Sequence, residues 1–152
     1  METYYETDDE IRELVSAFEA CRFHPSEFRH YQHLTVALWY VWHFSPEEAA
    51  TRISTGIRKL AKTYGRTGYH ETITLFWLRI VANFVGEHRT DSISSTANAL
   101  IECCNNKDLI REFYSAELLA TDKAKAEWVE PDLKAFATPR TVVQSAGQVA
   151  AT

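Results

Sequence analysis

Two short histidine clusters in this chain could support metal chemistry. His30 and His33 are three residues apart, and His70 begins a second cluster before an apolar run. Residues three apart lie on one face of a helix, so the first two imidazoles can point the same way. Imidazole is the commonest metal ligand in proteins. We therefore expect His30, His33 and His70 to hold a transition metal, iron or zinc, with a position open for water or substrate.

Two carboxylates accompany these histidines as candidate catalytic residues. Glu71 is a candidate general base or an outer partner of a metal ligand, and Glu27 is a candidate for the same roles. Glu27-x-x-His30 has the spacing used in di-metal carboxylate bundles, but the chain contains no second copy. The structural alternative for Glu71 is a first-turn carboxylate, with Gly68 as the cap, that accepts free backbone N–H groups. The histidines, likewise, could form a hydrogen-bonded polar core without a metal.

Arg79 and Tyr69 are the candidate substrate-binding residues. Arg79 is the only charged residue in the segment 72–85. A guanidinium buried in such a run needs a partner, which could be Glu27, Glu71 or a carboxylate of the first helix. Alternatively, its planar fork could bind the carboxylate or phosphate of a small anionic substrate. For Tyr69, the alternative to a ligand contact is packing in the core.

The residues around the clusters predict helices throughout. The segments 35–44 and 75–85 are apolar on nearly every side, which is typical of buried helices. Thr7 and Ser45 each begin an N-terminal capping pattern with a glutamate three residues later. The expected helices cover residues 7–21, 25–43, 45–65, 70–85, 92–104, 108–114 and 121–128. The sequence thus predicts an all-α, single-domain bundle of about five to seven helices over residues 1–137 and a disordered tail over 138–152.

Composition excludes several classes of function. The formal net charge is −5 and no Lys/Arg stripe is present, which argues against nucleic-acid binding. The three cysteines, Cys21, Cys103 and Cys104, have neither disulfide nor metal spacing. No apolar run reaches membrane-spanning length, and the polar, acidic N-terminus does not resemble a signal peptide. We expect a cytoplasmic protein with a small-molecule ligand, without nucleic-acid or membrane partners, and open to homo-oligomer formation.

Three short motifs resemble a pattern shared by small, uncharacterised bacterial helical proteins. They are Phe28-x-His30-x-x-His33-Leu34, then the segment 68–74 with the sequence GYHETIT, then Trp128-x-x-Pro131-Asp132-Leu133. The resemblance extends from about Phe23 to Leu133. It implies no particular activity or cofactor. It adds the last motif to the residues of interest, and the structural alternative there is a C-terminal latch on the bundle.

The sequence leaves two hypotheses for function. In the first, the protein is a transition-metal-dependent enzyme that acts on a small anionic substrate, by hydrolysis or by oxygen chemistry. In the second, it is a non-catalytic ligand-binding or protein-interaction module whose histidines are structural. Neither hypothesis identifies a reaction or a substrate.

Overall fold

Helices form all the regular structure in residues 3–136, the part of the chain that this computed structural model describes. The α-helices are α1 (Asp8–Glu19), α2 (His30–His43), α3 (Pro46–Thr63), α4 (Glu71–His88), α5 (Ile93–Cys104), α6 (Ala116–Leu119) and α7 (Asp122–Ala126), with 3-10 helices η1 (Pro25–Glu27) and η2 (Lys107–Glu112). This confirms the all-α prediction. The predicted tail at 138–152 lies outside the described residues.

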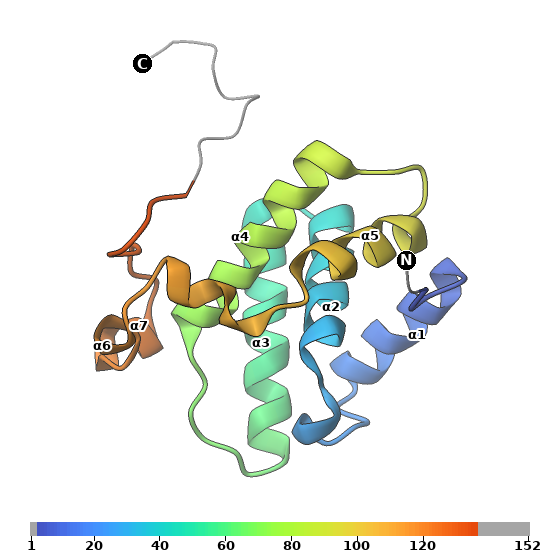
Figure 1. Cartoon of the computed structure of the whole chain (residues 1–152). Helices are drawn as coiled ribbons and strands as arrows, with labels where there is room; N and C mark the ends of the chain where they lie inside the picture. Colours follow the sequence, from blue (N-terminus) through green and yellow to red (C-terminus); the bar gives the residue numbers. More distant parts are fainter. Residues whose placement is uncertain (1–2, 137–152) are drawn as a thin grey trace.

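Helix α2 is the centre of the bundle. It packs against α1, α3, α4 and α5, and these neighbours surround it in Figure 1. Leu34, Thr35, Val36, Ala37 and Leu38 are all fully buried, as expected for a helix that is apolar on nearly every side. The start of α2, where the histidines lie, is therefore fixed by packing on several sides.

The predicted second helix over 25–43 is wrong in its first turn. Residues Pro25–Glu27 form a separate 3-10 turn, and Phe28 leaves the helical region with φ −88° and ψ 84°. The ring of Phe28 stacks on Phe18 at 5.2 Å and on Phe23 at 5.6 Å, between ring centroids. These contacts draw Phe28 into the core and start α2 only at His30. Glu27 and His30 consequently do not share one helix.

The caps at Thr7 and Ser45 are confirmed, but the cap of α4 differs from the prediction. Ser45 accepts a hydrogen bond from the Glu48 N–H at 3.2 Å, and Thr7 forms a reciprocal capping box with Glu10. At α4, the N-cap is His70, whose ring accepts the Ile73 N–H. Gly68 lies in the preceding loop at φ 93°, a conformation that suits glycine.

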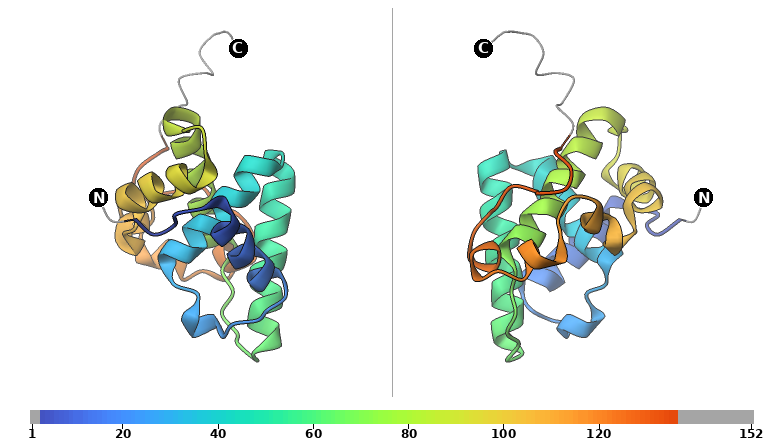
Figure 2. Two further views of the ribbon diagram at one scale, coloured as in Figure 1. Left: turned by 90° about the vertical axis from the view of Figure 1, so that its right-hand side faces the viewer. Right: turned by 60° about the vertical axis from the view of Figure 1, so that its left-hand side comes forward.

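The chain after α7 forms a strap, residues 127–136, that runs along α4 (Figure 2). Its carbonyls and N–H groups are held by Thr72, Phe113 and Tyr114: the Thr72 hydroxyl donates to the Glu127 carbonyl at 2.9 Å and the Tyr114 hydroxyl donates to the Val129 carbonyl at 2.6 Å. The Leu133 N–H donates to the Phe113 carbonyl at 2.9 Å. The third motif of the sequence is thus a latch, as its structural alternative predicted.

Gly56 provides a test of this packing, with Gly86 as its control. A Cβ on Gly56 in α3 would lie 2.6 Å from Cζ of Phe18, a ring with no exposed surface, whereas a Cβ on Gly86 in α4 would meet nothing within 4 Å. Alanine favours a helix by up to about 1 kcal/mol over glycine, while overpacking costs about 1–3 kcal/mol. We expect Gly56→Ala to lower the free energy of unfolding and Gly86→Ala to raise it, measured by urea unfolding. Equal stabilisation by both would contradict the α1–α3 contact.

Candidate ligand-binding site

His30 and His33 lie in the first turn of α2 and form a pair. Their ring centroids are 6.4 Å apart. The His30 ring meets Trp77 of α4 edge-on at 4.4 Å, and the His33 ring meets Phe28 at 5.8 Å. The prediction that the two imidazoles share one helix face is confirmed by this geometry.

The Nε2 atoms of this pair are buried and have no hydrogen-bond partner among the described residues. Burial, with a smaller contribution from the nearby His30, lowers the pKa of His33 to about 4. Burial also lowers the pKa of His30, with a contribution from the positive charge of Lys107, while the Cys104 carbonyl opposes the change. Both rings are therefore neutral at pH 7. A buried nitrogen without a partner calls for a ligand, an ion or an ordered water.

His70 has a different role from the one expected, because both of its ring nitrogens are hydrogen-bonded. Nδ1 accepts the Ile73 N–H at 3.2 Å, so the proton is on Nε2, which donates to the Leu119 carbonyl at 2.7 Å. His70 thereby caps α4 and ties it to α6. No three His, Cys, Asp or Glu side chains within residues 3–136 are grouped so that they could hold a metal ion. The three-histidine site is not confirmed.

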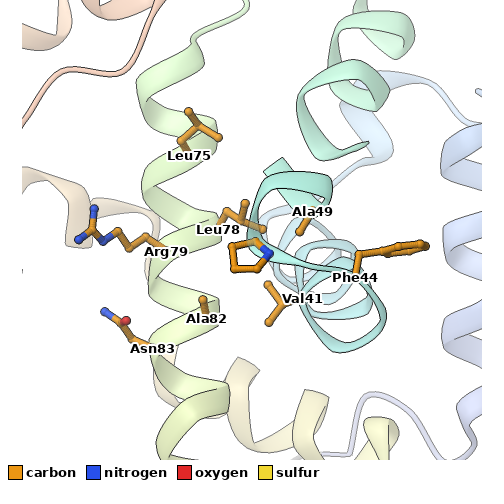
Figure 3. Close-up of a pocket in the computed structure, with 9 residues that line it drawn as sticks. Val41, Phe44, Ala49, Leu75, Leu78, Arg79, Ala82 and Asn83 are labelled. Atoms are coloured by element: carbon orange, nitrogen blue, oxygen red, sulfur yellow. The ribbon is translucent and has the colours of Figure 1, made fainter. Parts of the chain in front are cut away.

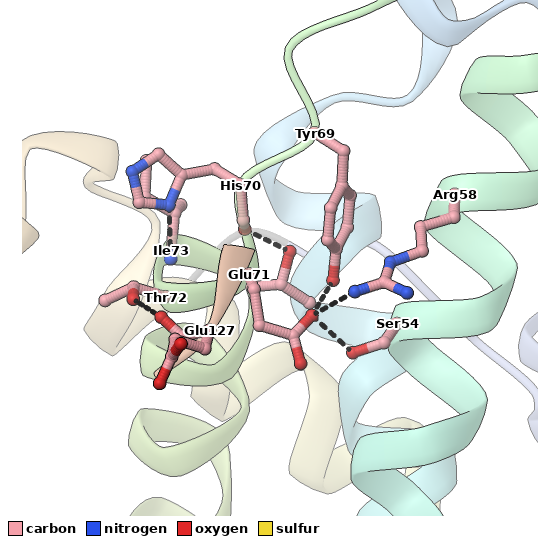
Figure 4. Close-up of polar contacts among 9 residues, drawn as sticks. Ser54, Arg58, Tyr69, His70, Glu71, Thr72, Ile73 and Glu127 are labelled. Atoms are coloured by element: carbon pink, nitrogen blue, oxygen red, sulfur yellow. Dashed lines mark hydrogen bonds and ion pairs between the residues drawn. The ribbon is translucent and has the colours of Figure 1, made fainter. Parts of the chain in front are cut away.

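Glu71 and Tyr69 form a clamp between α4 and α3 (Figure 4). One carboxylate oxygen of Glu71, Oε1, accepts the Tyr69 hydroxyl at 2.5 Å, the Ser54 hydroxyl at 3.2 Å and an Arg58 N–H at 3.3 Å. Burial and the bond to Glu71 raise the pKa of Tyr69. Both Ser54 and Arg58 belong to α3, so the carboxylate joins the start of α4 to that helix. The expected first-turn contacts of Glu71 with backbone N–H groups are replaced by these side-chain donors.

Glu27 is exposed, and its carboxylate accepts the His24 N–H at 2.8 Å. It therefore caps η1. A carboxylate already used in this way, outside α2, lacks the shared helix face that the Glu-x-x-His spacing had suggested.

The expectation that Arg79 is buried is wrong. Arg79 is exposed, and within residues 3–136 it forms no ion pair with a carboxylate. Its guanidinium lies 4.7 Å from the ring centroid of Phe136 in the strap. Because Arg79 is exposed, its charged head stays in water and needs no buried partner.

A pocket lies beside the histidine pair, and we call it the anion pocket because two cationic residues line it. It has a volume of about 720 Å³ and is lined by Tyr4, Ser26, Phe28, Arg29, His30, Tyr31, Asn105 and Lys107. Arg29 and Lys107 are exposed and form no ion pair with any described residue. The part of the chain that the structure describes places no carboxylate in this lining. Sequence reasoning missed both cations. Lys107 lies in the pocket because α5 packs against α2, and no local pattern shows that contact.

No protein-family model, no curated protein and no solved structure matches this chain. None of the helices in residues 3–136 has the length and apolar character needed to cross a membrane.

Proposed function

We propose that this protein is a non-catalytic binding module for a small ligand that carries an oxyanion, a phosphate or a carboxylate, in the anion pocket. The observation that carries the proposal is the charge of its lining. In a chain with a net charge of −5, the described residues give this pocket two cations without an ion pair and no carboxylate. Such a lining attracts anions and disfavours cations.

The start of α2 borders the same pocket, where His30 and Tyr31 are lining residues. The His33 N–H makes the first bond of the helix, to the Arg29 carbonyl at 3.0 Å. The N–H groups of His30, Tyr31 and Gln32 precede that bond and have no carbonyl to bind within α2. The N-cap residue is Arg29, whose side chain has no acceptor and makes no capping hydrogen bond to them. Free N–H groups at the positive end of a helix dipole favour an anion.

The walls indicate what else the ligand contains. Tyr4 and Tyr31 both line the pocket, with ring centroids 5.0 Å apart, and Phe28 lines it as well. Aromatic rings pack well against flat apolar groups. A ligand with an aromatic body and an oxyanion head therefore matches the lining better than an inorganic ion alone.

Isothermal titration calorimetry with phenyl phosphate, benzoate and inorganic phosphate tests this proposal. Loss of both cations in the double variant Arg29→Gln, Lys107→Gln should weaken phenyl phosphate binding by about tenfold, since each exposed ion pair contributes up to about 1 kcal/mol. The control variant Arg66→Gln, Lys62→Gln removes two exposed cations elsewhere. Binding should also weaken as salt rises. The relative affinities for phenyl phosphate and benzoate identify the preferred oxyanion. Equal affinities in the two double variants would refute the proposal.

The histidine pair supports a second candidate function, binding of a transition metal. Metals require neutral imidazoles, and His30 and His33 are neutral with unpartnered Nε2 atoms. These two residues would hold the metal, which would supply Lewis acidity for the enzyme hypothesis. His70 does not fit this ligand set because both of its nitrogens are bonded.

Elemental analysis of untagged protein prepared without chelators tests the metal candidate. We expect His30→Ala and His33→Ala to lose iron or zinc, because they remove the ligands, and His70→Ala to retain it. His88→Ala, at an exposed ring, is the surface control. Equal metal content in all of these variants would contradict binding by the pair.

A further inference from the structure

A second pocket, separate from the anion pocket, lies between the α2–α3 corner and α4 (Figure 3). Its volume is about 350 Å³ and most of its lining is apolar, including Phe44, Ala49, Leu78 and Ala82. Small-molecule sites in proteins have volumes of about 300–1,000 Å³ and this kind of lining, with a few polar groups.

The sequence explains why space remains at this corner. Ser45 caps α3 and Pro46 occupies its first turn, so the chain turns sharply after Phe44. The facing helices then present Ala49 from α3 and Ala82 from α4, whose small side chains leave the gap between them unfilled.

Two polar residues lie on one edge of the pocket. Arg79 and Asn83 are one helical turn apart on α4, and Figure 3 shows both side chains extending from that helix on the side away from Phe44. No carboxylate of residues 3–136 lines the pocket, and Arg79 forms no ion pair with any of them. Its present contact is the ring of Phe136 at 4.7 Å, an exposed cation–π contact of the weak kind. The long side chain can exchange that contact for a stronger one.

We infer that this pocket binds an amphipathic carboxylate, with an alkyl chain against Val41 and Leu78 and a carboxylate hydrogen-bonded to Arg79 and Asn83. Apolar walls bind the chain through the hydrophobic effect. The guanidinium fork matches a carboxylate in shape and charge, and the Asn83 amide adds a donor. An amine in the same place would meet Arg79 as a like charge.

Calorimetry with octanoate, 1-octanol and octylamine tests the chemistry of this site. We expect octanoate to bind most tightly and octylamine least tightly. Arg79→Gln should reduce octanoate affinity by about tenfold or more and leave octanol binding nearly unchanged. Arg66→Gln, at an exposed arginine of the loop between α3 and α4, is the matched control. Equal affinities of octanoate and octanol, or an Arg79→Gln variant with full octanoate affinity, would overturn the assignment.

Ala82 tests the location, because it lines the pocket yet is exposed on α4. Ala82→Leu fills the space without disturbing the core, so thermal melting should be unchanged while octanoate affinity falls at least tenfold; Ala126→Leu, at an exposed position of α7, is the control. If Ala82→Leu has a lowered melting temperature, Ala82→Gln provides a second variant at the same position. Retained affinity in the folded Ala82 variants would overturn the site. The Arg29→Gln, Lys107→Gln variant should bind octanoate with native affinity. The binding proposals for the two pockets are therefore tested independently.

Discussion

Lowering the pH from 7 to 4 is expected to cost the native protein about 3 kcal/mol of stability through His33 alone. The pKa of His33 is about 4 in the folded protein, against an ordinary value of 6.5. Between these values the unfolded chain binds a proton that the folded protein does not bind. Stability is therefore complete above pH 6.5, falls as the pH drops, and levels off below pH 4. His30, whose pKa is also lowered, adds to the loss.

Urea unfolding at pH 7 and pH 4 measures this effect by comparing the native protein with His33→Gln, whose side chain does not titrate. The native protein should lose about 3 kcal/mol more than the variant between the two pH values. Carboxylates also titrate in this range, but they contribute equally to both proteins and cancel. His88→Gln, at an exposed ring, should retain the native difference. A His33→Gln variant with the full native loss would show that His33 is not the buried neutral ring described above.

Replacement of Glu71 by leucine is expected to lower the free energy of unfolding by about 2–3 kcal/mol. One oxygen of this carboxylate accepts hydrogen bonds from Tyr69, Ser54 and Arg58, and its side chain is only 19% exposed. Removing the acceptor leaves the Tyr69 and Ser54 hydroxyls without their partner in a partly buried setting. Glu71→Gln keeps an acceptor oxygen and should cost about 1 kcal/mol or less.

This comparison separates the clamp from the catalytic role considered for Glu71. A general base that contributes nothing to the fold could be replaced with stability unchanged, whereas a clamp residue could not. Glu87→Leu, at an exposed position of the same helix, controls for the added apolar side chain and should fall within about 0.5 kcal/mol of the native protein. Equal stability of Glu71→Leu and Glu87→Leu would refute the clamp.

The sequence by itself determined the helical elements and the pairing of the first histidines. Local signals suffice for these features: the Thr7 and Ser45 caps are contained within four residues, and the spacing of His30 and His33 fixes their shared face once α2 forms. The apolar run of α2 likewise predicts its burial, since nearly every face of that helix must avoid water.

Only the tertiary structure decided which side chains meet. Phe28 packs on Phe18 and Phe23, and Glu27 lies outside the helix that carries His30. The Glu-x-x-His spacing had favoured a single helix for Glu27 and His30. Likewise, Arg79 is exposed and lies beside Phe136 of the strap, a contact between residues too far apart in sequence for a local pattern to encode it.

The tertiary structure also decided the roles of the second histidine cluster and of the anion pocket. His70 uses Nε2 on the Leu119 carbonyl, and Lys107 lines the pocket of His30, in both cases through contacts between segments far apart in the chain. A residue type and its spacing set what chemistry a side chain can do. Whether a ring nitrogen or a cation is free to do it depends on partners that packing supplies, and packing is not a local property of the sequence.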